Sequence, residues 1–326
     1  MTTFLLSTIG KRGYIAEYLR RADPSVRVIA TGHDPYTPGF ASVDRAVLVP
    51  SIWDPEYSNA LLEVVDRERV DAILTFADPD TVALSRIRSQ LVERGVACFF
   101  PPEAVAKICF DKYETHRWAE TNGFSSPRTV LSWPEARDVF GAEFVAKPRT
   151  GSASTGVLFI RSDEDDSVLE PDVSYIFQEK ILGEEVNLEI LGSLEGKPVG
   201  LSSWRKLRSR HGETELAVTF RDERILEFAE RLASAVQMVG PCDVDLMVDG
   251  DAIHLIEFNA RFGGGYPTSD LAGAQFPELL VDMARGEVPE LTVSFEPDIF
   301  MMKQLRPFGG PVKDMAGLLG LEGDGQ

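Results

Sequence analysis

Residues 242–261, CDVDLMVDGDAIHLIEFNAR, carry the strongest fold signal in the chain. Polar and apolar residues alternate on both sides of a central Asp-Gly pair, a pattern that predicts two antiparallel strands joined by a tight turn. A three-residue loop would place Asp245 opposite Glu257. The same register would place Asp243 opposite Asn259, whereas a two-residue loop would remove both pairings. The segment therefore predicts a β-hairpin with a polar face.

Directly opposed carboxylates repel each other, so the predicted hairpin requires a compensating partner. A hard divalent cation such as Mg²⁺, bridged to the phosphates of a nucleotide, would supply it. The alternative is that both carboxylates are solvated on an exposed face. Two features disfavour this alternative. Glu257 stands between Ile256 and Phe258 in an apolar run, and the glycine-rich stretch 261–266, RFGGGY, suits close approach of a ligand.

Residues 144–157, FVAKPRTGSASTGV, predict a strand that runs into a Gly/Ser loop and returns. Lys147 and Arg149, with the hydroxyl and backbone N–H groups of the loop, would suit a phosphate. No Gly-Lys-Ser/Thr follows, so this is not a Walker A sequence, and the loop does not open a helix as a dinucleotide fingerprint would. Taken alone, the loop favours an ordinary turn over a phosphate site.

Residues 205–210, RKLRSR, concentrate four basic residues in six positions of an acidic chain. In a regular strand, Lys206, Arg208 and Arg210 would share one face and form an anion site. A solvated edge strand is the alternative.

The first hundred residues alternate apolar strands with helical patterns, which predicts a parallel sheet with helices on both faces. The expected strands are 3–9, 26–31, 45–49, 72–76 and 97–100, and the expected helices are 12–21, 56–67 and 79–94. Ligands of such sheets bind beyond the carboxyl ends of the strands, so Arg12, Asp78 and Asp80 are candidate contacts. Ordinary turns and helix caps are the alternative. Two prolines then end the pattern, and a helix over 103–120 leads into strands of antiparallel character.

The charge and composition exclude several classes of protein. The chain has 326 residues, with 33 basic against 52 acidic side chains and a net charge of -19, which disfavours nucleic acid and anionic membranes as partners. Its 44% hydrophobic and 26% charged content is that of an ordinary globular protein. No secretion or membrane signal precedes the first strand, so we expect a cytoplasmic location. Its three widely spaced cysteines predict neither disulfides nor a zinc site, and each is expected in the core or as a surface thiol.

In their order and spacing, these segments resemble the ATP-grasp superfamily, particularly the carbamoyl-phosphate-synthase-like carboxylate-amine ligases. The resemblance spans about residues 1–310. It implies an α/β fold, α+β in its C-terminal half, in which ATP is clamped between a small lid and the last domain. The implied divisions are a βαβ domain with a parallel sheet at 1–103, a linker helix and lid at 104–182, a mixed or antiparallel domain at 183–310, and a short tail at 311–326.

The resemblance also implies how the nucleotide is held. Lys147 would bind the α- and β-phosphates. Adenine would be bound by backbone groups of Glu179 and Ile181 and by the side chain of Glu179 or Lys180. Glu185 would accept a hydrogen bond from a ribose hydroxyl. The residues implied to contact ATP are Lys112, Lys147, Arg149, Ser152, Ser154, Thr155, Gln178, Glu179, Lys180, Ile181 and Glu185.

Three further positions match the metal ligands of the family: Asp245, Glu257 and Asn259. The first is often Gln or Glu in relatives, and the shorter Asp here would shift one contact. Arg261 matches the arginine that steadies the transferred phosphoryl group. Lys206, Arg208 and Arg210 match a basic strand facing the γ-phosphate.

The resemblance implies an enzyme that uses Mg-ATP, with Mn²⁺ as an alternative metal, to convert a small carboxylate such as an amino acid into an acyl-phosphate for attack by an amine. A homodimer is compatible with the family. Candidates for substrate selection are Arg12, Asp78, Asp80, Gly264, Gly265 and Arg306.

Three alternatives stay open at this point. A phosphotransferase would use the same nucleotide site and stop at a stable phosphorylated product. A non-catalytic nucleotide-binding subunit would bind ATP without turnover. A dehydrogenase is disfavoured, because residues 7–13 contain only two glycines of the dinucleotide fingerprint.

Overall fold

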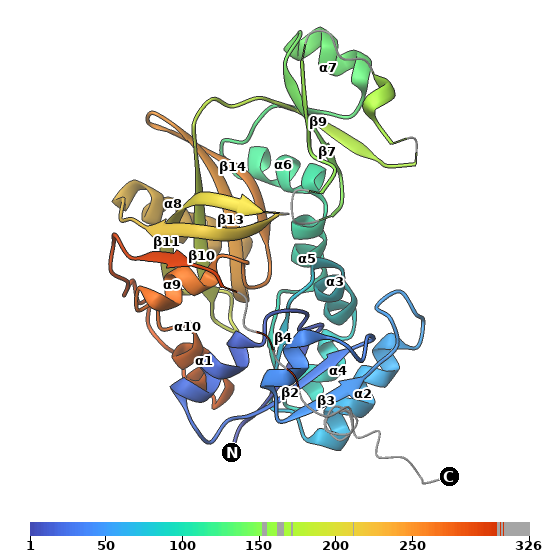
Figure 1. Cartoon of the computed structure of the whole chain (residues 1–326), viewed down its shortest axis with the longest axis vertical. Helices are drawn as coiled ribbons and strands as arrows, with labels where there is room; N and C mark the ends of the chain where they lie inside the picture. The colour runs from blue at the N-terminus through green and yellow to red at the C-terminus, as the bar shows by residue number, and fades with distance from the viewer. Residues whose placement is uncertain are drawn as a thin grey trace.

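The computed structural model describes residues 1–151, 155–161, 166–170, 172–210, 212–304, 307 and 309. Within these residues the strands form three sheets. Figure 1 shows the N-terminal sheet at the lower right, a small sheet at the top, and the largest sheet at the left. The α/β class, with a parallel N-terminal sheet and antiparallel sheets after it, is confirmed. The exact domain limits stay a prediction.

The N-terminal sheet has the strand order β3-β2-β1-β4-β5, and its strands are parallel. They run over Arg45–Leu48, Arg27–Gly32, Thr3–Ser7, Ala72–Thr75 and Ala97–Phe99, and the accompanying helices are α1 (Tyr14–Ala22), α2 (Tyr57–Glu68), α3 (Asp78–Arg86) and α4 (Arg88–Glu93). A short 3-10 helix, η1, covers Pro38–Ser42. Because β1 lies between β2 and β4, the sheet has a switch point at the carboxyl ends of β1 and β4.

Three elements are shorter than the sequence pattern predicts. The first strand ends at Ser7 because Thr8 has a left-handed backbone, with φ of 52°. The helix expected over 79–94 divides at Ile87. The helix expected over 103–120 divides into α5 (Glu103–Phe110) and α6 (Lys112–Thr121), because the carboxylate of Asp111 accepts backbone N–H groups and caps a new helix.

The small sheet at the top of Figure 1 is antiparallel, with the order β6-β9-β7-β8. Its strands cover Thr129–Val130, Tyr175–Glu179, Phe144–Pro148 and Leu158–Ile160, and it carries α7 (Trp133–Phe140) and the short 3-10 helix η2 (Asp166–Val168). Trp133 packs edge-on against Phe144 and Phe177. This unit therefore has its own apolar cluster. We call it the lid.

The largest sheet is antiparallel, with the order β14-β13-β10-β11-β12-β15. Its strands cover Ala252–Asn259, Gly240–Asp249, Glu184–Gly192, Pro198–Arg210, Glu213–Thr219 and Phe300–Met302. Helix α8 (Glu223–Val236) packs on β10 and β11, and α9 (Tyr266–Leu271) and α10 (Phe276–Ala284) follow the hairpin. We call this sheet the C-terminal sheet.

The predicted carboxylate opposition on the hairpin is confirmed, although the predicted loop length is wrong. Asp245 pairs with Glu257, and Asp243 pairs with Asn259. The turn is shorter than expected, because Asp249 already pairs with Ala252. A β-bulge between the turn and Glu257 supplies the missing residue and restores the expected register.

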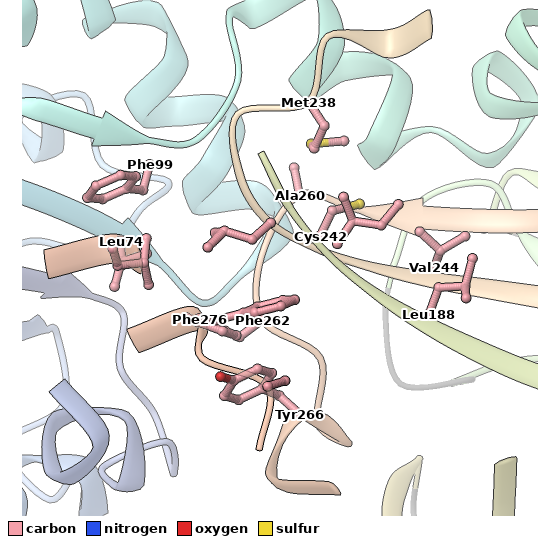
Figure 2. Close-up of a cluster of buried hydrophobic side chains, with 14 of the residues drawn as sticks. Leu74, Phe99, Leu188, Met238, Cys242, Val244, Ala260, Phe262, Tyr266 and Phe276 are labelled. Carbon is pink, nitrogen blue, oxygen red and sulfur yellow. The ribbon is translucent and has the colours of Figure 1, made fainter. Parts of the chain in front are cut away.

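One apolar core joins the N-terminal sheet to the C-terminal sheet. Leu74 and Phe99 of the first sheet lie in the same cluster as Cys242 and Val244 of the second (Figure 2). Phe262, directly after the hairpin, packs between the sheets and stacks on Phe76. The hairpin is therefore held against the carboxyl edge of the N-terminal sheet.

The three cysteines, Cys98, Cys109 and Cys242, are all buried and free, so the core alternative for them is confirmed. Among the described residues, no helix has the length and apolar composition needed to cross a membrane.

The glycine loop after the hairpin gives a direct test of this packing. A Cβ atom at Gly265 would lie 2.0 Å from the ring of Trp204, whereas one at Gly264 would meet nothing closer than 3.5 Å. We expect Gly265→Ala to lower the free energy of unfolding by about 3 kcal/mol through overpacking. The matched variant Gly264→Ala should change it by less than about 0.5 kcal/mol. Denaturant unfolding of both variants measures the difference, and equal stabilities would contradict the described packing.

Candidate nucleotide and metal site

A cavity lies between the lid and the C-terminal sheet, as the pattern of segments predicts. One part of its wall is apolar and comes from both sheets, with Val145, Val157, Phe159, Met247 and Ile256. The other part is charged, with Lys112, Lys147, Glu185, Asp245 and Glu257. An apolar wall suits a flat base and a charged wall suits phosphates, so the cavity has the chemistry of a nucleotide site.

Residues 178–181 line the cavity at the end of β9. Gln178 is buried and donates to the Thr129 hydroxyl at 3.0 Å. The side chains of Glu179 and Lys180 are engaged elsewhere, since Glu179 accepts two hydrogen bonds from Arg128 and Lys180 donates to Glu143. A base contact here would therefore come from the backbone, and the expected side-chain contact lacks support.

The start of α6 connects the lid to the hairpin. Nζ of Lys112 donates to the carbonyl of Gly151 in the lid loop at 2.8 Å, and it lies 3.4 Å from Oε2 of Glu257. Lys112 thus touches both walls of the cavity. Thr155 also lines it, while Ser152 and Ser154 lie outside the described residues.

In this structure Arg149 is paired with a carboxylate, and its predicted contact with phosphate stays a prediction. Its Nε donates to both carboxylate oxygens of Asp111, at 2.8 and 2.7 Å, and its guanidinium lies over the Tyr113 ring. Arg149 is not among the residues that line the cavity. It ties the end of β7 to the cap of α6 instead.

The central row of the site crosses three strands and contains Asn187, Asp245 and Glu257. The amide Nδ2 of Asn187 donates to Oδ1 of Asp245. Lys206 on β11 donates to Glu185, and its Nζ lies 3.9 Å from Asp245. The two opposed carboxylates are therefore surrounded by amide and ammonium donors.

The electrostatic environments of the two carboxyl groups differ. Burial and the charge of Asp243 raise the pKa of Asp245 well above its usual value. Burial also acts to raise the pKa of Glu257, but Lys112 and Lys147 outweigh it and lower this pKa. The surroundings therefore favour the charged form of Glu257 and disfavour the charged form of Asp245.

The lysines respond to the same charges. Burial lowers the pKa of Lys147 below that of an ordinary lysine. Burial would also lower the pKa of Lys206, but Asp245 and Glu185 reverse the effect and raise it. Lys206 is thus paired with carboxylates, and the charges of Glu257 and Asp245 partly offset the effect of burial on Lys147.

The residues fit a divalent cation only together with a second set of oxygen ligands. Across the described ranges, no three His, Cys, Asp or Glu side chains are arranged to hold a metal by themselves. Asp245 and Glu257 are directly opposed, and Oδ1 of Asn187 beside them is buried with no hydrogen-bond partner within the described part of the chain. Two directly opposed carboxylates, with Asn259 as the third ligand that the resemblance implies, suit Mg²⁺ completed by phosphate oxygens.

The prediction that three basic residues share one face of β11 is wrong. Register shifts at Lys206/Arg208 and Arg208/Ser209 interrupt the alternation, so only Lys206 is directed at the carboxylates. Arg208 is exposed, and Arg210 lies 4.0 Å from Glu215. Bulges of this kind are not visible in a residue pattern.

Arg261 lies at the inner end of the site and is almost fully buried. Its Nε is 3.1 Å from Oδ1 of Asp78, and its Nη1 donates to Oδ2 of Asp243 at 3.2 Å. Burial opposes its charge, but Asp78 and Asp243 raise its pKa further above the usual value. Asn259 is buried opposite Asp243 in the same row of the sheet.

The substrate candidates divide into three groups. Arg12 and Asp78 lie at the switch point, where Nη1 of Arg12 donates to the Phe76 carbonyl at 2.7 Å. Asp80 is fully buried and accepts hydrogen bonds from Thr8 and Tyr57, so it does not face a ligand. Gly264 lies beside Glu213 and Lys303, whereas Gly265 is required by Trp204, and Arg306 lies outside the described residues.

Sequence reasoning missed two residues of the site. Asn187 lies between Glu185 and Glu189 on one face of β10, and the alternation of these polar residues was an available signal. Asp111 falls inside the helix expected over 103–120, although it caps α6 and binds Arg149. Its partner lies in a distant segment, so no local pattern indicated that contact.

A cavity between two antiparallel sheets, lined by lysines and by two opposed carboxylates, has the architecture of an ATP-grasp nucleotide site. Residues 109–265 match the family described as ATP-grasp domain, and residues 4–99 match PylC-like, N-terminal domain. Residues 109–265 thus form an ATP-grasp domain.

Named relatives agree with this assignment. The chain is 24% identical over 257 residues to 3-methyl-D-ornithine--L-lysine ligase of Methanosarcina barkeri, covering 79% of this chain and 66% of the relative. It is 26% identical to the carbamoyl phosphate synthase large chain of Rubrobacter xylanophilus, covering 77% of this chain and 26% of the relative. The chain thus spans less than two thirds of these relatives.

A solved structure shows the same fold. N5-carboxyaminoimidazole synthetase from Staphylococcus aureus, complexed with ADP, superposes with a TM-score of 0.75 at 14% identity, covering 93% of this chain and 82% of that one.

The different environments of Lys147 and Arg149 predict different losses of nucleotide affinity. Lys147→Met should weaken binding of a non-hydrolysable ATP analogue with Mg²⁺ by at least about tenfold, because a charge-assisted contact to phosphate is lost. Arg149→Met should weaken it by less than about threefold, because Arg149 binds Asp111. Isothermal titration calorimetry provides the measurement. Equal losses in the two variants would show that Arg149 reaches the phosphates.

Proposed function

We propose that this protein is an ATP-dependent ligase that activates a small carboxylate as an acyl-phosphate for attack by an amine. The observation that carries the proposal is the convergence of Lys112, Lys147 and Lys206 on the opposed carboxylates Asp245 and Glu257. These lysines come from a helix start, the lid and the C-terminal sheet, so the site is completed only when the three parts lie together.

Binding of ATP would exchange the partners of these charges. Phosphate oxygens would take Lys112, Lys147 and Lys206, and Asp245 and Glu257 would be left to hold Mg²⁺, with Asn259 as the third proposed ligand. The metal, when bound, supplies charge neutralisation on the transferred phosphoryl group. The exchange avoids leaving any buried charge without a partner.

The chemistry then requires positioning rather than a covalent enzyme intermediate. An oxygen of the substrate carboxylate attacks the γ-phosphorus, and the bond to ADP breaks. The amine nitrogen next attacks the acyl carbon, inorganic phosphate leaves, and the nitrogen loses a proton. Arg261 would bind the substrate carboxylate and the acyl-phosphate formed from it. Lys206 would face the charge that develops on the transferred phosphoryl group. The lid would exclude water, which otherwise hydrolyses the intermediate.

Several parts of this proposal rest on the relatives. The proteins described as ligases support the reaction class, but this chain covers only part of their length. Use of Mn²⁺, a homodimer and a cytoplasmic location stay predictions. A phosphotransferase remains the alternative outcome at the same nucleotide site.

Removal of one proposed metal ligand tests the site. Glu257→Gln should lower ADP formation by at least about 100-fold, because the neutral amide removes one of the two negative charges that would hold Mg²⁺. Glu230→Gln, at an exposed position of α8 that does not line the cavity, is the matched control and should keep wild-type turnover. A coupled ADP assay measures both. Undiminished turnover in the Glu257 variant would contradict the metal assignment.

Trapping of the intermediate separates ligase from phosphotransferase. With ATP, Mg²⁺ and a cognate carboxylate, hydroxylamine should give a stable hydroxamate, because it attacks an acyl-phosphate at carbon. Its amount should match the inorganic phosphate released. A stable phosphorylated product without free phosphate would instead establish a phosphotransferase.

A further inference from the structure

The two faces of the C-terminal sheet carry different helices. Val244 and Phe258 pair across neighbouring strands and therefore share the face opposite the carboxylate row, which we call the outer face. Trp118 of α6 packs edge-on against Phe258. Phe124, which stacks on Trp118, also packs edge-on against Phe228 of α8. Helices α6 and α8 therefore cover the outer face over β14, β10 and β11.

A row of side chains on the outer face continues to the edge of the sheet. Val186 of β10 lies on this face, two positions from the partner of Val244. Across the neighbouring strands, Val186 pairs with Arg205, and Arg205 pairs with Val218. Val218 in turn pairs with Phe300 of β15, the last strand of the sheet. Residues of β12 and β15 therefore extend the outer face beyond β11.

This last part of the outer face is open to solvent. Leu216 and Met302 form a second pair beside Val218 and Phe300. Phe300 and Met302 are 62% and 66% exposed, and Leu216 and Val218 are partly buried. These four apolar side chains form an exposed strip on β12 and β15, which we call the apolar strip.

A basic residue borders the apolar strip. The register shift in β11 places Arg208 opposite Leu216, and therefore on the outer face. Arg208 is exposed and forms no ion pair with any residue that the structure describes, whereas Arg205 is bound to Glu184. In a chain with a net charge of -19, an unpaired guanidinium beside an apolar surface is complementary to an acidic partner.

The width of the open region matches one helix. At the usual strand spacing, β11, β12 and β15 span about 10 Å between their outer axes. An α-helix with its side chains is also about 10 Å wide. Because α6 and α8 already cover the neighbouring strands of this face, the apolar strip is the position that a third helix would take.

The apolar strip is too small to hold a second copy of the chain. Four side chains with these exposures present on the order of 300 Å² of apolar surface, whereas each partner of a stable dimer contributes roughly 800 Å². A single amphipathic helix binds through a few apolar side chains on one of its faces, so the available area suffices for it.

We propose that the apolar strip and Arg208 form a docking surface for an acidic amphipathic helix of a partner protein. Apolar side chains of that helix would pack on Phe300 and Met302, and one of its carboxylates would pair with Arg208. The inference is independent of the proposed ligase function, because none of these residues lines the nucleotide cavity.

Binding of a synthetic helix tests the proposal. The probe is a fluorescein-labelled peptide of about 18 residues with leucine along one helical stripe and glutamate and alanine elsewhere. A matched peptide has glutamine in place of glutamate. Fluorescence polarisation with the full-length protein at low salt should show the acidic peptide bound at least about threefold more tightly than the neutral one, because only the acidic peptide forms an ion pair with Arg208.

Surface variants assign the binding to the proposed residues. Met302→Ser should weaken binding of the acidic peptide by at least about fivefold, because a large apolar contact is lost. Leu271→Ser, at an exposed leucine of α9, is the matched control and should bind as the wild type does. Arg208→Gln should abolish the preference for the acidic peptide, whereas Arg86→Gln on the exposed side of α3 should keep it. Thermal unfolding verifies that the variants are folded.

Several results would overturn the proposal. Equal affinity of the wild type for the two peptides, or no binding of either, would do so. A dimer in analytical ultracentrifugation that Met302→Ser dissociates would show that a second copy occupies the apolar strip. Cosedimentation with phosphatidylglycerol vesicles that Arg208→Gln abolishes would assign the surface to a membrane instead.

Discussion

The direct opposition of Asp245 and Glu257 on neighbouring strands is the constraint on which the rest of the site depends. Two carboxyl groups cannot be partly buried side by side without cations or a shared proton. Here the cations come from Lys112 at the start of α6, Lys147 on the lid and Lys206 on β11. The need to compensate these two carboxylates therefore explains why lysines from three separate parts of the fold lie around a single cavity.

The same principle extends along the C-terminal sheet toward the N-terminal sheet. One row deeper, Glu189 and Asp243 are opposed, and Arg261 binds Asp243 while reaching Asp78 across the boundary between the sheets. The site thus consists of ion pairs, and a ligand must replace one partner of each pair in order to bind. A chain with a net charge of -19 would bind a polyanion here because four of its basic side chains, Lys112, Lys147, Lys206 and Arg261, lie at these pairs.

Sequence alone predicted the fold class, the hairpin and its opposed carboxylates, because alternation and an Asp-Gly turn are local signals. The predicted register of the hairpin is right, but the reason given for it is wrong. A three-residue loop was expected, whereas the structure has a shorter turn and a bulge beside Glu257. The shared face of residues 205–210 failed because bulges leave no residue signature. The ion pairs of Arg149 and Asp78 could not be predicted for another reason. Their partners lie in distant segments, and only the tertiary fold brings them together.

Calorimetric titration of ATP into the wild-type protein, with Mg²⁺ and with the metal removed by EDTA, tests the central claim most directly. If Asp245 and Glu257 exchange their lysines for a metal, affinity should fall by at least about tenfold without Mg²⁺, because the phosphates would then face two uncompensated carboxyl groups. Equal affinity under the two conditions would contradict the account. It would mean that the opposed carboxylates serve the fold and not the nucleotide.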